Sequence, residues 1–152
     1  MVLPSVLILF CLLANGYAQS ASTAPIALAV HVLVPCSNRD AGQSVKLPGV
    51  EASLCLDRTP FLTQKDVQSA EIHKNSKGSP VVFLTFHEDA ALRELEITHK
   101  NIGNRVGIVL NGRVVSAPSI SASSRFLYID ANYTGKQAQD LAAALNKQAA
   151  SR

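Results

Sequence analysis

The chain has 152 residues, a typical length for a single globular domain. Apolar residues make up 47% of it and charged residues 16%, a balance that argues against an intrinsically disordered protein. The formal net charge is +3, aromatic residues are 5% and tryptophan is missing, so the sequence holds neither a basic arm nor an aromatic-rich motif of the kind that binds nucleic acids. We therefore expect no nucleic-acid partner.

The first eighteen residues predict a secretory signal peptide. Residues 5–14 form an apolar run of about ten residues, which is too short to span a bilayer. Gly16 and Ala18 then occupy the −3 and −1 positions of a small-residue cleavage site. We predict cleavage after Ala18, a flexible leader at 19–24, and a mature chain that is exported to the periplasm or secreted and holds no integral membrane segment. The alternative is an uncleaved apolar tail, because no lysine or arginine precedes the apolar run.

The cysteines fit an oxidising compartment. Cleavage would remove Cys11 and leave Cys36 and Cys55, and an even pair of this kind most often forms a disulfide. Two alternatives stay open. One is a metal site, although two cysteines nineteen residues apart lack the usual zinc spacing, and the other is a pair of unlinked small apolar residues. A disulfide would close a loop of about twenty residues and contribute roughly 3 kcal/mol to stability.

The domain, which we place at residues 25–152, begins with two predicted strands. Residues 26–34 alternate with the two-residue period of a β-strand, and Pro35 ends the run. Residues 36–49 are polar and predict a loop. Residues 50–56 alternate again and predict the second strand.

A short helix is expected next. Thr63 is a suitable N-cap, and Asp66 in the first turn completes a weak capping box. In such a helix Val67 and Ala70, three residues apart, would both face inward.

A turn at residues 74–80 leads into an apolar strand at 81–86 and then into the clearest helix. The helix follows His87 and has two acidic residues in its first turn, where the helix dipole favours them. Gly103 lies just past its end, at the position where a left-handed residue is common. The apolar residues that we place on one helix face are Ala91, Leu92, Leu95 and Ile102.

Residues 105–117 predict a β-hairpin. Asn111 and Gly112 separate two apolar runs, and an Asn-Gly pair favours the two-residue type I′ turn, which needs a positive φ at both positions. Pro118 then ends the second strand of the hairpin.

The C-terminal segment predicts a strand at 125–130 and a final helix. Thr134 and Gln137 have the spacing of a capping box. The apolar stripe of this helix is Ala138, Leu141, Ala142 and Leu145. From residue 50 onward the order β-α-β-α-β-β-β-α predicts an α+β two-layer sandwich, in which two main helices cover one face of a mostly antiparallel or mixed sheet.

Several short motifs keep an order and spacing that are typical of one known family. They are LTxxD at 62–66, LTF at 84–86, TxxNIG at 98–103, IVLNG at 108–112, VxSAP at 114–118 and NYT at 132–134. Over residues 50–146 the sequence thereby resembles the head subdomain of the large periplasmic domain of the SecD/SecF protein-export membrane proteins.

This resemblance implies a periplasmic domain that handles emerging polypeptide. In the family, export-coupled work depends on membrane helices that carry a proton flux. Because no such helix follows the segment here, we expect a free-standing, exported version of the head that keeps only the binding part or has moved to another role.

The sequence offers no catalytic or metal-binding pattern. Of its four histidines, His87 and His99 would lie about 18 Å apart on one straight helix, too far to share a metal ion. Known zinc, nucleophile and phosphate-binding motifs do not occur, and a serine cluster at 116–124 is typical of a loop. We therefore expect no enzyme activity, catalytic residue, metal ion or cofactor.

Two function classes remain, with binding residues that the sequence does not identify. The first is a non-enzymatic periplasmic module that contacts exported or unfolded polypeptide or an envelope partner. The second is a structural accessory subunit of an envelope assembly, and an unrecognised hydrolase is a distant third. The first strand, residues 26–34, lies outside the resemblance, so that it either covers an edge of the common core or offers a new edge for strand pairing.

Overall fold

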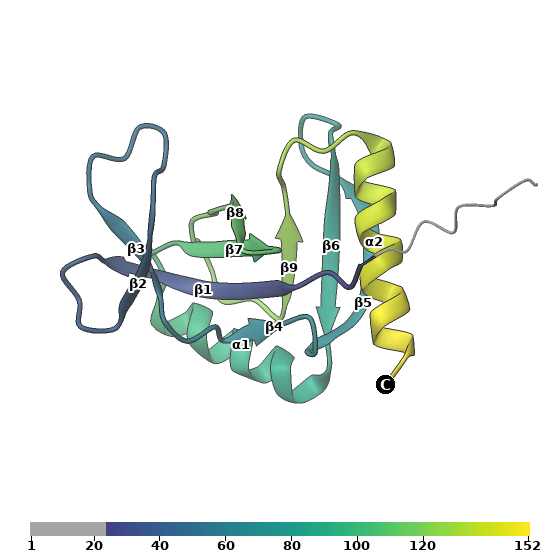
Figure 1. Cartoon of the computed structure of the whole chain (residues 1–152), viewed down its shortest axis with the longest axis horizontal. Coiled ribbons are helices and arrows are strands. Elements are labelled where there is room, and N and C mark those ends of the chain that lie inside the picture. Colours follow the sequence, from purple (N-terminus) through teal and green to yellow (C-terminus); the bar gives the residue numbers. More distant parts are fainter. Residues whose placement is uncertain (1–23) are drawn as a thin grey trace, which may run out of the picture.

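The structure, a computed structural model, describes residues 24–152 (Figure 1). The predicted signal peptide and nearly all of the predicted leader lie outside these residues. The described elements are, in chain order, β1 Leu28–Pro35, β2 Ala41–Val45, β3 Leu54–Asp57, β4 Leu62–Thr63, β5 Val67–Lys74, β6 Pro80–Phe86, α1 Glu88–Lys100, β7 Val106–Leu110, β8 Arg113–Ser116, β9 Phe126–Ile129 and α2 Gly135–Ala150.

The strands form two sheets. One has the order β2-β3-β1-β7-β8, with β4 also paired to β1, and the other has the order β5-β6-β9. In Figure 1 the strands of the two sheets run crosswise, and α2 lies along the three-stranded sheet, where it packs against β5 and β6. All pairings are antiparallel. The predicted α+β class is confirmed, with the strands divided between two sheets.

β1 is the central strand of the six-stranded sheet. One of its edges pairs with β7, where Val30 lies opposite Ile108. The other edge pairs first with β4, opposite Leu62, and then with β3, where Leu33 lies opposite Leu56. The first strand therefore covers an edge of the core, and the alternative that it offers a new edge is wrong.

The core has two parts. The larger part fills the space between the two sheets and the helices, and the apolar stripe predicted for α2, from Ala138 to Leu145, is buried there. The smaller part lies at the far end of β1, where Leu33 packs with Val45, Leu56 and Val109. Since β1 contributes to both parts, it connects them.

Two predictions along the N-terminal half are wrong. Residues 41–45, expected in a loop, form β2, a polar edge strand of which only Val45 is buried. The helix expected from Thr63 is also absent from the described chain, and residues 67–74 form β5 instead. A β-bulge between Val67 and Ser69 shifts the register, so that Val67 and Ala70 are both buried although they lie on a strand.

The buried face of α1 also differs from the expectation. The fully buried residues of this helix are Ala90, Glu94 and Thr98. Leu92 is 49% exposed and Ile102 is 53% exposed, so the prediction is wrong for these two residues. Ala91, by contrast, is partly buried against the core. The face that packs on the core carries two polar side chains, which an apolar pattern cannot reveal.

The turn, the left-handed glycine after α1 and the helix cap predicted from the sequence are present. Asn111 and Gly112 have φ values of 49° and 78°, as the turn requires, and Gly103 has a φ of 89°. The side chains and backbones of Thr134 and Gln137 form a reciprocal capping box at the start of α2.

The predicted disulfide between Cys36 and Cys55 is confirmed, with a Cα–Cα distance of 5.0 Å. Val34 lies opposite Cys55, and the Cys36 backbone N–H donates to the Ser53 carbonyl. The two cysteines are therefore diagonal neighbours across the ladder between β1 and β3, within the reach of a disulfide.

The hairpin turn can be tested by adding one methyl group. Gly112→Ala should lower the free energy of unfolding by about 1–2 kcal/mol, because a side chain is disfavoured at this positive φ. Gly135 is a matched control, since an added Cβ there also meets no atom within 4 Å and its φ is not in the left-handed range. Gly135→Ala should leave stability unchanged or raise it by up to about 1 kcal/mol. Equal losses for the two variants in urea unfolding would contradict this explanation of the turn.

Candidate functional site

The residues singled out from the sequence do not gather in one place. The disulfide joins the ends of β1 and β3, the Asn-Gly turn joins β7 to β8, and Gly103 and the capping box lie at helix ends. Each has a structural role. The Asn111 side chain also accepts a hydrogen bond from the Ala27 N–H at 2.9 Å, which ties the turn to the start of β1.

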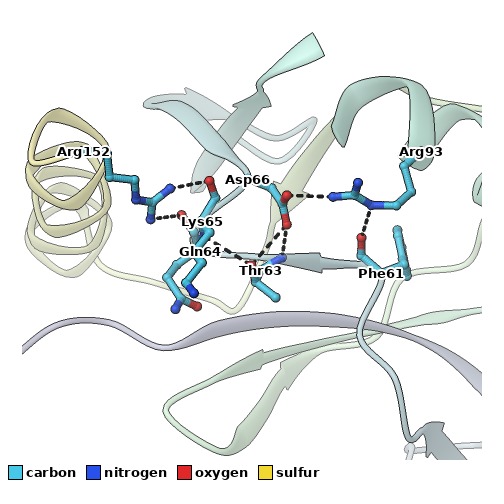
Figure 2. Close-up of polar contacts among 7 residues, drawn as sticks. All are labelled: Phe61, Thr63, Gln64, Lys65, Asp66, Arg93 and Arg152. Atoms are coloured by element: carbon cyan, nitrogen blue, oxygen red, sulfur yellow. Dashed lines mark hydrogen bonds and ion pairs between the residues drawn. The ribbon is translucent and has the colours of Figure 1, made fainter. Parts of the chain in front are cut away.

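Figure 2 shows why the segment between β4 and β5 is a turn. The carboxylate of Asp66 accepts hydrogen bonds from the backbone N–H and the hydroxyl of Thr63, at 2.7 and 3.1 Å. Arg93 of α1 donates to Asp66 at 2.7 Å and to the carbonyl of Phe61 at 2.8 Å. The LTxxD motif thus closes a turn and fastens it to α1, which is a structural role.

Arg152 reaches the same turn from beyond the end of α2. Its guanidinium donates to the backbone carbonyls of Gln64 and Lys65 (Figure 2). Two arginines from opposite sides therefore hold the turn.

The histidines do not form a site. His31 contacts the Asp57 carbonyl through Nδ1 at 2.6 Å, and His87 and His99 lie at opposite ends of α1. His73 stacks on Phe83 with ring centroids 4.6 Å apart. Within residues 24–152, no group of three histidine, cysteine or acidic side chains is arranged to hold a metal ion.

Open strand edges are the first feature that could bind a partner. β2 and β8 are the edge strands of the larger sheet, and β5 and β9 are those of the smaller sheet. The segments 43–48 and 112–117, which include the edges of β2 and β8, line one groove of about 490 Å³. Unpaired edge strands carry backbone donors and acceptors that an added strand can use.

The edge of β9 adjoins a second hollow, of about 310 Å³, which we call the β9 pocket. Its walls come from α1, the start of β7, the loop at 118–124 and β9 itself. The residues that line it are Glu94, Thr98, Val106, Pro118, Ser119, Ile120, Ser121, Ala122, Ser123, Ser124, Phe126, Leu127 and Tyr128. The serine cluster that the sequence places in a loop therefore forms much of its wall.

A short hydrogen-bond chain fixes the loop against α1. The hydroxyl of Thr98 donates to the backbone carbonyl of Glu94 at 2.8 Å and accepts from the Ser124 N–H at 2.9 Å. Ser124 in turn bonds through its hydroxyl to the backbone of Phe126. These contacts hold the pocket wall in place without help from a ligand.

Aromatic rings flank the pocket on the outer face of the small sheet. Phe126 and Tyr128 are 44% and 42% exposed, and their ring centroids lie 5.7 Å apart. Both also contact Phe83 of β6, with ring centroids 5.3 and 4.9 Å away. Exposed aromatic side chains grouped in this way are a common feature of protein-binding surfaces.

Glu94 is the one ionisable residue in the described chain that is fully buried. Its side chain is 1% exposed, and Oε2 has no hydrogen-bond partner among residues 24–152. Burial raises the pKa of this carboxyl group to about 8, so that it is mostly protonated at pH 7. Sequence patterns provide no reason to select this residue, because a glutamate on a helix is normally exposed.

The comparisons with known proteins agree on one family. Residues 41–150 match the family model described as SecDF, P1 head subdomain. The chain is 33% identical over 86 residues to the protein translocase subunit SecD of Acidaminococcus fermentans, which covers 55% of this chain and 21% of that protein. For SecD of Aquifex aeolicus the identity is 36% over 88 residues, covering 57% of this chain and 18% of that protein.

The fold is similar to that of solved SecDF structures. One of them, a structure of "a membrane component SecDF that enhances protein export", has a TM-score of 0.61 and 25% identity, and the match covers 80% of this chain and 62% of that one. The chain spans about a fifth of the length of the curated relatives described above. No helix in residues 24–152 is long and apolar enough to cross a membrane.

Glu94 should make stability depend on pH. Its pKa is higher in the folded protein, about 8, than the ordinary value of 4.5, so the folded state holds a proton that the unfolded chain loses between these values. The contribution of the protonated Glu94 to the free energy of unfolding is complete below about pH 4.5 and is lost as the pH rises to about 8. Between these values the free energy of unfolding should fall by up to about 1.4 kcal/mol per pH unit. Glu94→Gln should remove this slope in urea unfolding at several pH values. A slope that is identical in the variant would contradict the assignment.

Proposed function

The chain belongs to the SecDF P1 head subdomain family, and we propose that it serves protein export as a non-enzymatic module that binds extended polypeptide outside the membrane. The observation that carries the proposal is the outer edge of β9, which pairs with no second strand among residues 24–152 and lies beside a pocket and two half-exposed aromatic rings. On this strand the backbone N–H and carbonyl of Phe126 bond to the Ser124 hydroxyl, which an added strand would have to replace. The family match and the related SecDF, which is described as enhancing protein export, both support a polypeptide as the ligand.

A strand edge suits a ligand of variable sequence. The backbone of an extended segment can pair with β9, while its side chains contact the pocket and the aromatic face. Backbone hydrogen bonds do not depend on the side chains, so many client sequences can bind. We expect modest affinity, because an extended client loses chain entropy when it docks.

β9 suits this role better than β1. Both edges of β1 are occupied, and a ligand there would have to displace β7, β4 or β3. β9 pairs only with β6, and the pocket that borders it is preformed by the contacts of Thr98 and Ser124.

The groove between β2 and β8 supports the second function class, a structural accessory that pairs with one partner protein. Within the described chain, no backbone hydrogen bond reaches residues 113–116 from outside the ladder with β7. A single strand of an envelope partner could occupy this groove. One stoichiometric partner, in place of many clients, would distinguish this role.

We also propose that the chain is exported and acts in the periplasm. The apolar run at 5–14 and the small residues Gly16 and Ala18 support cleavage after Ala18, and the disulfide agrees with an oxidising compartment. Mass spectrometry of protein from the envelope fraction should therefore show Gln19 as the first residue. Recovery of the intact chain beginning with Met1 would rule out this processing.

The binding surface can be tested with unfolded model polypeptides. Phe126→Ala and Tyr128→Ala should each weaken binding by about three- to tenfold, because each removes a large apolar contact at the edge of β9. Leu92→Ala is a matched control, since Leu92 is 49% exposed on α1 and does not line the β9 pocket. Fluorescence anisotropy of a labelled peptide measures the change.

Two results would overturn the proposal. One is a wild-type protein that binds no unfolded polypeptide at high micromolar concentration. The other is an equal loss of binding in Leu92→Ala, which would show that contact with β9 is not specific. Unchanged thermal unfolding of the three variants is the control for folding.

A further inference from the structure

We propose that the β9 pocket takes the side chain of a lysine from the bound polypeptide, with the carboxylate of Glu94 as the counter-charge of its ammonium group. The inference rests on the proposed function, because the lysine is presented by an extended segment along β9. It adds a preference within that function, so that segments with a suitably placed lysine are retained more tightly than others.

The pocket has an inner end and a mouth. Glu94 is 1% exposed and Thr98 is 6% exposed, so they mark the inner end, on α1. Ser121, Phe126 and Tyr128 are exposed and mark the mouth. A side chain that enters from the edge of β9 would therefore have its stem in the pocket and its tip at the carboxyl group.

The walls fit an apolar stem with a charged tip. Val106, Ile120 and Leu127 are buried apolar residues that can contact methylene groups. Phe126 and Tyr128 at the mouth can contact the methylene groups of the stem that lie nearest to the backbone of the segment. The hydroxyl groups of the 118–124 loop can accept hydrogen bonds that remain on the ammonium.

The unpaired carboxyl group indicates the charge of the ligand. Oε2 of Glu94 is buried without a hydrogen-bond partner, which is costly, and no lysine, arginine or histidine is among the residues that line the pocket. An ammonium group would supply both the missing hydrogen bond and the opposite charge. A neutral side chain would supply only the first, and an acidic one would be repelled.

Binding should be linked to the loss of a proton. In the protein alone, burial holds the pKa of Glu94 at about 8, whereas an adjacent ammonium group favours the carboxylate and lowers that pKa. The affinity for a lysine segment should therefore rise as the pH increases from about 6 to 8. The net release of protons should be measurable by calorimetry in buffers of different ionisation enthalpy.

Few other charged groups face this carboxyl group. Tyr128 is the only other titratable side chain that lines the pocket, and the loop at 118–124 and β6 contribute none. On α1 itself, Arg93 is engaged with Asp66. Arg105, which precedes β7, donates to the Ala117 carbonyl. His73 stacks on Phe83, and its ring centroid lies 6.1 Å from that of Tyr128 at the mouth of the pocket. The Glu94→Gln variant, which keeps His73, therefore separates a pH dependence that comes from Glu94 from one that comes from His73.

The experiment compares two labelled peptides that differ only at a central residue, lysine in one and norleucine, which has the same four-carbon stem without the ammonium group, in the other. The wild-type protein should bind the lysine peptide about tenfold more tightly at pH 8, a difference typical of one charged hydrogen bond. Glu94→Gln should bind both equally, with the affinity of the wild-type protein for norleucine. Equal binding by the wild-type protein, or an unchanged preference in Glu94→Gln, would overturn the inference.

A second measurement uses the wild-type protein alone and so does not depend on how a variant folds. The ¹³C titration of the Glu94 carboxyl group should move to lower pH by about one unit or more when the lysine peptide is bound. The norleucine peptide should leave it in place. A titration that does not respond to the lysine peptide would overturn the inference.

The controls separate this inference from the function on which it rests. Binding of both peptides without a preference leaves the proposed function standing and removes the lysine pocket. If neither peptide binds, the proposed function fails, and n-butylammonium then tests the pocket by itself. If n-butylammonium lowers the titration midpoint of the Glu94 carboxyl group and the lysine peptide does not, the pocket is a small-amine site. This result would overturn the assignment of a polypeptide as its ligand.

Discussion

The pairing of β1 is the constraint on which the rest of the fold depends. Its eight residues pair with β7 on one edge and with β4 and β3 in succession on the other. Leu28 and Val30 enter the larger core and Leu33 enters the smaller one, so this strand joins both. β1 lies outside residues 41–150, which match the family model. The matched segment by itself would therefore leave β7, β3 and β4 without the strand that holds them together.

This central position also decides where a partner can bind. With β1 enclosed, the open edges are those of β2, β8, β5 and β9, and only β9 combines an edge with a preformed pocket and exposed aromatic rings. Thr98 fastens the 118–124 loop, which forms part of the pocket wall, to α1 through the Ser124 N–H. A polar residue on the buried face of α1 thereby contributes to the position of the pocket wall.

Sequence reasoning succeeded where local chemistry determines the structure. The Asn-Gly turn, the capping box at Thr134 and the stripe of α2 each follow from neighbours within a few residues, and the structure has all three. Predictions from the sequence failed where contacts between residues distant in sequence determine the secondary structure. The spacing of Val67 and Ala70 imitates a helix because a bulge against β6 reproduces a three-residue repeat on a strand. β2 is too polar to be recognised, since it becomes a strand only by pairing with β3.

Glu94 shows why the candidate site could not be predicted in the same way. An apolar pattern selects Leu92 for the core, yet Leu92 is exposed and the carboxyl group is buried. An unpaired buried carboxyl group lowers stability when it is ionised. A sequence optimised for stability alone would therefore have an apolar residue at position 94. The fold tolerates Glu94 by keeping it protonated, and it does so beside an open strand edge. The cost in stability and the proposed capacity to receive a cation therefore have the same physical origin, which is the burial of one carboxyl group whose Oε2 has no hydrogen-bond partner among residues 24–152.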